Sequence, residues 1–179
     1  MPAGVTYTTI ATQTLGSSQS SISFTSISQS YTDLIIVSSL RGSTSNDFRA
    51  RWGNGSYDTG TNYSNTTMYA RSTSNDYGSS RDSNSNYARL SSQTYVIPEA
   101  AATFGTNITH IMNYSKTTTF KSGLSRSSGI GAAAYAGTEA MVFLWRSTAA
   151  VNQIQFYAGA SSGNFESGTT ITLYGILAA

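Results

Sequence analysis

Residues 168–176 read GTTITLYGI, and polar and apolar side chains alternate along this stretch. Ile171 and Leu173 fall on one side of an extended chain, and hydroxyl-bearing residues fall on the other. A period of two predicts a β-strand with one buried face. Gly175 continues the apolar side, where the missing side chain allows a bulge or the close approach of another backbone.

The same alternation extends to other parts of the chain. It recurs in DFRARW (47–52) and VNQIQFYAG (151–159), and weaker versions occur in TYTTIATQTL, SISFTSI, TTMYARS, NYARLSSQTYVI, TNITHIMNY and TTFKSGL. The only Ala-rich segment, GIGAAAYAG (129–137), is bounded by glycines and predicts two helical turns at most. Roughly ten short strands separated by Gly, Ser, Asn and Asp indicate an all-β protein. We therefore expect one domain over residues 1–179, an antiparallel two-sheet β-sandwich of jelly-roll-like type.

Two runs are apolar on both faces, LIIV at 34–37 and AMVFLW at 140–145. Such runs predict central strands. Each is either covered on both sides, or covered on one side and docked to a neighbour on the other.

Composition narrows the classes of function. Charged residues make up 10% of the chain, against about a quarter in ordinary soluble proteins. Ser and Thr supply 31 and 25 residues, so the predicted surface is neutral and rich in hydroxyls, which suits a protein held in an assembly. The net charge of +2 comes from scattered cations and does not predict nucleic-acid binding. No apolar run approaches the ~20 residues of a membrane span, and the N-terminus lacks the pattern of a secretory signal.

Catalytic chemistry is not predicted. The chain has no Cys and a single His, His110, which alternation places on the same face as Ile108 and Met112. A structural role is expected for His110 because no partner motif stands near it. The eight acids are spread among turns, and no nucleophile, phosphate-binding or dinucleotide motif is present. We expect neither an enzyme nor a cofactor or metal site.

Residues 42–90 differ from their flanks, with long polar stretches in which Tyr recurs among Ser, Gly and Asn. This mixture is typical of adaptable contact surfaces, so we interpret the region as elaborated polar loops at an ordered edge of the sandwich. Two partners fit it, another protein or a glycan. The candidate contact residues are the aromatic and basic ones: Tyr57, Tyr63, Tyr69, Arg71, Tyr77, Arg81 and Tyr87.

The stretches YTTIATQTL, SISFTSISQSYTDLIIVSSLRG and WRSTAAVNQIQFYAGASSGNFESGTTITLYGILAA resemble a group of β-rich virion proteins of tailed bacteriophages. The resemblance implies a capsid or tail component with a jelly-roll-like fold. It also implies a homotrimer whose partners are the major capsid protein or other virion proteins, assembled in the host bacterial cytoplasm. The shared motifs describe strands, so the resemblance assigns no functional residue.

Two roles within the virion are open at this point. A receptor-binding fibre needs an attachment segment and a shaft, whereas here the strands begin within about ten residues of Met1 and no heptads occur. We therefore expect a capsid decoration (cement) protein that stabilises the head by bridging capsid subunits. The alternative is a tail-fibre or receptor-binding module that recognises a host surface glycan. A viral glycan hydrolase ranks third.

Overall fold

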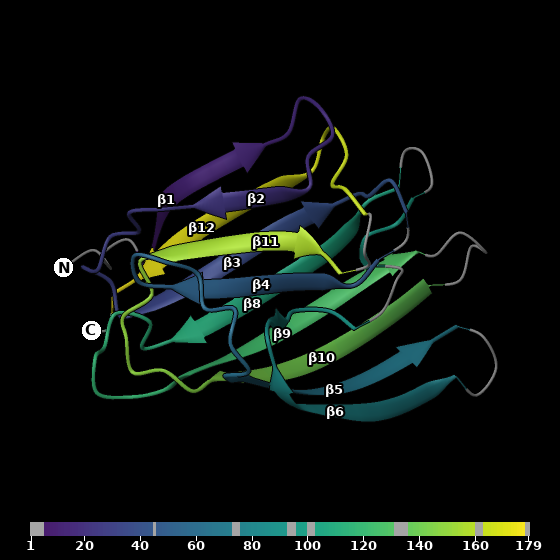
Figure 1. The fold of residues 1–179 in the computed structure, drawn as a ribbon. Coiled ribbons are helices and arrows are strands. Elements are labelled where there is room, and N and C mark those ends of the chain that lie inside the picture. Colours follow the sequence, from purple (N-terminus) through teal and green to yellow (C-terminus); the bar gives the residue numbers. More distant parts are fainter. Residues whose placement is uncertain are drawn as a thin grey trace.

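The computed structural model describes residues 6–44, 46–72, 76–92, 96–99, 103–130, 136–159 and 163–177. Within these ranges the chain is all-β, with an eight-stranded and a four-stranded antiparallel sheet packed as a sandwich (Figure 1). The predicted fold class is confirmed. The narrower jelly-roll assignment stays a prediction.

The large sheet has the order β1-β12-β3-β8-β9-β10-β5-β6, and the small sheet has the order β2-β11-β4-β7. The strands span β1 Tyr7–Thr14, β2 Ser21–Phe24, β3 Asp33–Leu40, β4 Phe48–Gly53, β5 Tyr63–Arg71, β6 Tyr77–Ser85, β7 Ala88–Arg89, β8 Gly105–Met112, β9 Lys121–Ile130, β10 Ala136–Trp145, β11 Gln153–Ala158 and β12 Thr170–Ile176.

The core lies between the two sheets and is rich in aromatic rings. On β4 the alternating residues Phe48, Ala50 and Trp52 are fully buried, as the sequence pattern predicts. The ring of Trp52 meets Phe143 of β10 with centroids 5.4 Å apart, which joins the small sheet to the large one. Within the small sheet, Phe48 stacks on Phe156 of β11 at 5.5 Å. Such ring pairs stabilise the fold beyond the contribution of burying their apolar surface.

Gly175 of β12 lies on the buried face with Ile171 and Leu173, as expected. What approaches it is a side chain and not a backbone. A Cβ atom at Gly175 would lie 2.3 Å from Cγ of Tyr31, so the Tyr31 ring occupies the space that a larger residue would fill.

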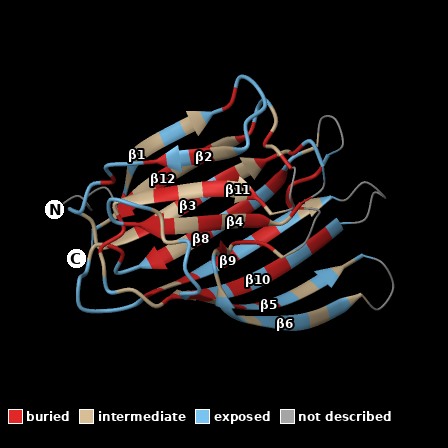
Figure 2. Ribbon diagram, in the orientation of Figure 1, coloured by how far each residue is buried: buried red, intermediate tan, exposed pale blue. Residues whose placement is uncertain are grey.

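The polar stretch at 72–87 is largely a strand, which corrects the prediction of loops there. β6 forms the edge of the large sheet and is exposed or half-buried along its whole length (Figure 2). An edge strand that buries neither face has no apolar period, so its sequence resembles a loop. Part of this region thus forms the edge of the large sheet, and its role as a contact surface stays a prediction. Of the strand predicted at 86–97, the structure has only β7, and residues 93–95 lie outside the described part of the chain. Residues 131–135 of the Ala-rich segment also lie outside it.

The loop from Asn54 to Asn62 is held by the carboxylate of Asp58. This group accepts hydrogen bonds from the Trp145 indole nitrogen (2.7 Å), the Asn62 amide (2.9 Å) and the Gly60 backbone nitrogen (2.8 Å). Burial pushes the pKa of Asp58 upward, but these three donors outweigh it and lower the pKa. The loop is therefore tied to the end of β10.

The two runs that are apolar on both faces, β3 and β10, are interior strands of the large sheet. Only one face of each is covered within the chain, because Val37 and Val142 remain 37% and 53% exposed on the other. Coverage on both sides is therefore wrong for the single chain. No helix in the described ranges has the length and apolar character to cross a membrane.

Candidate functional site

The outer face of the large sheet, turned away from the small sheet, carries apolar side chains where water is expected. On β8 and β9 the outward positions include Ile108, Met112 and Leu124. The inward positions are mostly polar and buried: Asn107, Thr109, Ser125 and Ser127. Antiparallel sheets with one wet face normally show the opposite arrangement. Around Ile108 and Leu124, the usual binary pattern of these two strands is thus reversed.

The buried polar groups form one network around the Leu90 carbonyl. Asn107 Nδ2 lies 3.0 Å from that oxygen, 2.7 Å from Ser125 Oγ and 2.8 Å from Ser127 Oγ. Ser125 Oγ also donates to the Leu90 carbonyl at 2.6 Å, and Thr109 Oγ1 donates to Asn107 Oδ1 at 2.8 Å. Every member has a partner, so the inward polar face is satisfied. The network holds β8 and β9 in the register that turns their apolar residues outward.

The outward apolar residues form a stripe across β3, β8, β9, β10 and β5. The register sets Val37 opposite Ile108, Leu124 opposite Val142, and Ala140 opposite Met68. Three members are about half exposed or more, with values of 49% for Ile108, 53% for Val142 and 65% for Met68. A contiguous exposed apolar patch marks an interaction surface. We call these six residues the apolar stripe: Val37, Ile108, Leu124, Ala140, Val142 and Met68.

Arg126 of β9 interrupts the stripe, paired across the strands with Ile108 on β8 and with Ala140 on β10. Two hollows flank it. One of about 330 Å³ lies towards β10 and β5 and is lined by Arg126, Ala140 and Met68 with their neighbours. The other, of about 230 Å³, lies towards β8 and is lined by Ile108, His110, Leu124 and Arg126. A third, of about 250 Å³, lies beyond the first at the ends of β5 and β10.

His110 lies on the rim of the second hollow, on the same face as Ile108 and Met112, as predicted. Its Nε2 is 2.9 Å from Asp33 Oδ2 at the start of β3. The other oxygen of Asp33 accepts the Asn113 backbone N–H at 2.8 Å. This histidine joins two strands by a hydrogen bond, which is the structural role expected of it.

Of the seven residues predicted as contacts, Tyr63 is placed in the core. Its side chain has no exposed surface, and its hydroxyl accepts the Trp52 N–H at 3.1 Å and donates to the Asp58 carbonyl at 3.1 Å. A surface contact role for Tyr63 is therefore wrong. Tyr57 lies in the loop after β4 and is half-buried beside Gly53.

The other five are divided between the two sides of the sheet edge. On the inner side, the Arg71 guanidinium lies over the Tyr69 ring at 5.2 Å and pairs with Asp76 at 3.0 Å. On the outer side, Tyr77 pairs with Ala70 and Arg81 with Thr66, so both continue the outer face onto β6. The structure does not bring these residues together with Tyr87 in one surface.

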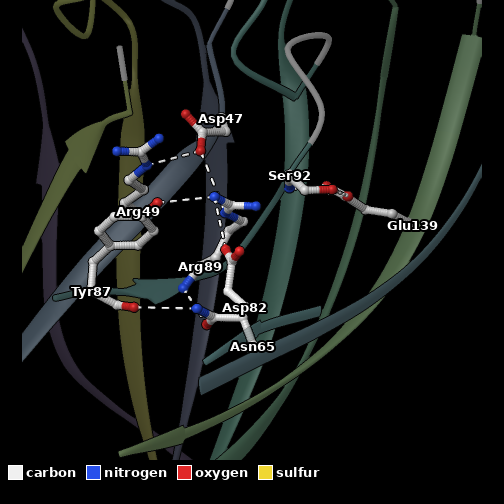
Figure 3. A network of polar contacts seen from close by, with 8 residues as sticks. All are labelled: Asp47, Arg49, Asn65, Asp82, Tyr87, Arg89, Ser92 and Glu139. Carbon is white, nitrogen blue, oxygen red and sulfur yellow. Dashed lines mark hydrogen bonds and ion pairs between the residues drawn. The ribbon is translucent and has the colours of Figure 1, made fainter. Parts of the chain in front are cut away.

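Tyr87 belongs to an internal polar network between the small sheet and the edge of the large one (Figure 3). The Arg49 guanidinium lies over its ring at 4.1 Å, and Arg89 donates to its hydroxyl at 2.9 Å. Arg89 also pairs with Asp82 of β6 at 3.0 Å, and Arg49 pairs with Asp47 at 2.8 Å. Tyr87 is therefore a bridge within the fold.

The stripe and Arg126 were not among the contact residues predicted from the sequence. One sequence signal for the stripe was present, since LIIV and AMVFLW are apolar on both faces. A second was the run NITHIM, in which either half of the alternation can be taken as the buried one.

In comparisons with known proteins, the chain matches no family model, no curated protein and no solved structure. Among the described residues, no group of three or more His, Asp or Glu side chains is placed to hold a metal ion.

Proposed function

We propose that the chain is a structural virion protein, a capsid decoration protein that attaches to the phage head through the outer face of its large sheet. The observation that carries the proposal is the reversed pattern of β8 and β9, with Asn107 and Ser125 buried and Ile108 and Leu124 outside. An apolar stripe exposed on the outer face of a sheet is kept from water in an assembly where another protein covers it.

The outer face around the stripe is large enough for one ordinary protein contact. Five strands ~4.8 Å apart, each with three to four outward residues ~6.7 Å apart, span roughly 500 Å² in projection, and the six residues of the stripe form the apolar centre of this area. Specific interfaces bury ~800 Å² per partner, with an apolar centre and a polar rim. Thr66, Thr138 and Ser128 lie on the outer face beside the stripe and supply hydroxyls for such a rim.

Removal of the protein tests the role. Particles assembled without it should form, but should burst at a lower temperature and under milder osmotic shock than complete particles. Unchanged robustness would contradict a decoration role.

A charge placed in the stripe tests the surface. Val142→Asp should leave the fold intact and abolish attachment to particles that lack the protein, because the carboxylate would lose its water when the partner covers it. Gln155→Asp, on the outward side of β11 in the small sheet, is the matched control and should attach normally. Attachment of Val142→Asp at wild-type affinity would place the contact elsewhere.

One observation favours the alternative of a tail module that binds a host glycan. Tyr77 is 73% exposed at the sheet edge, with Arg81 on the same side of β6, and Tyr rings stack on sugars. A glycan array probed with the wild-type chain and with Tyr77→Ala checks this function. Binding lost in the variant would support it, and no binding by the wild type would count against it.

A further inference from the structure

Arg126 is the one cation within the apolar stripe. Its cross-strand neighbours are Ile108 and Ala140, and the next outward residues on its own strand are Leu124 and Ser128. Within the described part of the chain, its guanidinium makes no hydrogen bond, ion pair or ring contact.

The other basic side chains mostly have partners. Arg49, Arg71 and Arg89 form ion pairs. Four other basic side chains donate hydrogen bonds to backbone carbonyls: Arg41, Arg51, Arg146 and Lys121. Arg81 and Lys116 lie on the edge strand and on the loop after β8, where water solvates them. Arg126 differs because its direct cross-strand neighbours on both sides are apolar.

We propose that the outer face binds a segment of a partner protein that presents a carboxylate between two apolar side chains. Arg126 pairs with the carboxylate, and the apolar side chains enter the hollows of about 330 Å³ and about 230 Å³ on either side of it. This inference rests on the proposed function, in which another protein covers the outer face, and it specifies the chemistry of that protein.

Charge complementarity gives this contact its specificity. A partner that covers the stripe removes water from Arg126, and a buried guanidinium without a counter-charge is strongly unfavourable. A carboxylate that accepts two parallel hydrogen bonds from the guanidinium satisfies it and fixes the orientation of the partner. A neutral apolar surface of the same shape would bind weakly.

A second copy of this chain does not supply that carboxylate. At least seven of its eight Asp and Glu side-chain carboxylates already have a partner: Asp33 with His110, Asp47 with Arg49, Asp58 with Trp145, Asp76 with Arg71, Asp82 with Arg89, Glu139 with Ser92 and Glu166 with Ser18. Pairing Arg126 with any of them would disturb an existing contact. We therefore infer that the partner is a different protein.

Binding of purified chain to particles that lack it tests the proposal. Arg126→Ala should weaken binding by roughly 30-fold or more, and Arg126→Glu should abolish it, because a buried pair loses one member. Arg126→Lys should be intermediate, since it keeps the charge and loses the two-pronged geometry. Wild-type binding should also fall more steeply with salt than that of Arg126→Ala. Lys116→Glu, with the same change of charge on the loop after β8, should bind as the wild type does.

The outcomes separate the two claims. Binding of Arg126→Glu at wild-type affinity would overturn the inference and leave the proposed function standing. No binding of the wild type to particles would overturn the proposed function and the inference with it. Sedimentation of the free chain tests whether a second copy is the partner. We expect no self-association through Arg126. Self-association of the wild type that Arg126→Glu abolishes would make a second copy the partner and overturn the inference. Displacement of wild-type chain from particles by millimolar sialic or galacturonic acid would instead make the ligand an acidic sugar.

Discussion

The ring of Phe143 on β10 lies directly over Gly123 on β9, its cross-strand neighbour. A Cβ atom at Gly123 would come within 2.2 Å of Phe143 Cζ and 2.6 Å of the His110 carbonyl oxygen. The ring thus fills the space that the glycine leaves open. This contact holds β9 in the register that turns Ser125 inward and Arg126 outward.

Gly123→Ala should lower the free energy of unfolding by about 2 kcal/mol, because the added methyl overpacks a site closed by a ring and a backbone oxygen. Urea denaturation measures the change. Gly16→Ala is the matched control, since no atom lies within 4 Å of its Cβ position. That control should be neutral, or stabilising by about 0.5 kcal/mol, through the unfolded state. Equal effects of the two substitutions would contradict the packing described here.

Two neighbouring residues on β8 should respond in opposite ways. Asn107→Ala should destabilise the free chain by about 2 to 4 kcal/mol, because it strips a buried network of its central member. Ile108→Thr should change stability by less than about 1 kcal/mol, since only cross-strand contacts on an exposed face are lost. It should nevertheless weaken attachment to particles. Thermal unfolding and a pelleting assay give both readouts, and a large loss of stability in Ile108→Thr would contradict an exposed outer face.

Alkaline pH should unfold the protein through its buried tyrosines. Burial raises the pKa of Tyr63 above its usual value and raises the pKa of Tyr114 to about 12. In the unfolded chain both ionise near pH ~10, whereas in the folded chain they keep their protons. The folded state therefore binds more protons in this window, so stability falls as the pH rises from ~10 towards 12.

Tyr63→Phe isolates the contribution of Tyr63 to this pH dependence. The free energy of unfolding of the variant should be lower by about 1 kcal/mol at neutral pH, because Phe lacks the hydroxyl that bonds to backbone groups of Trp52 and Asp58. Its stability should then decline less steeply above pH ~10 than that of the wild type. Denaturation curves at several pH values provide the comparison, and identical slopes would show that Tyr63 does not control the alkaline transition.

The tyrosines of the predicted contact region should separate into structural and exposed ones. Tyr87→Ala should cost about 2 kcal/mol of stability, because it removes a ring and hydroxyl that contact Arg49 and Arg89. Tyr77→Ala should change stability by less than about 0.5 kcal/mol, since that ring is 73% exposed. Calorimetric melting temperatures test both, and a stable Tyr87→Ala would contradict the bridging role of Tyr87.

The sequence predicts best where one face of a strand is buried. Phe48 and Trp52 on β4, or Ile171 and Leu173 on β12, alternate with polar residues and lie in the core as expected. The edge strand β6 was missed because backbone pairing alone holds it in the sheet, and neither of its faces imposes an apolar period.

The candidate site was harder to predict, for a different physical reason. Alternation identifies two faces of β8 and β9 but not which one is inside. The core burial of Asn107 depends on the Leu90 carbonyl, a partner distant in sequence. The composition of residues 42–90 drew attention to tyrosines, yet Tyr63 is buried by the same ring packing that builds the core, against Trp145 at 6.4 Å. Arg126 carries no local signal, because its significance comes from neighbours on other strands.

Electron cryomicroscopy of intact particles would show where the chain lies and what covers its outer face. We predict copies of this chain over the seams between capsid subunits, in threefold clusters, with Val142 and Met68 buried against a neighbouring protein and a carboxylate beside Arg126. Copies whose outer face points to solvent would contradict it. Copies confined to the tail tip would exclude the decoration role.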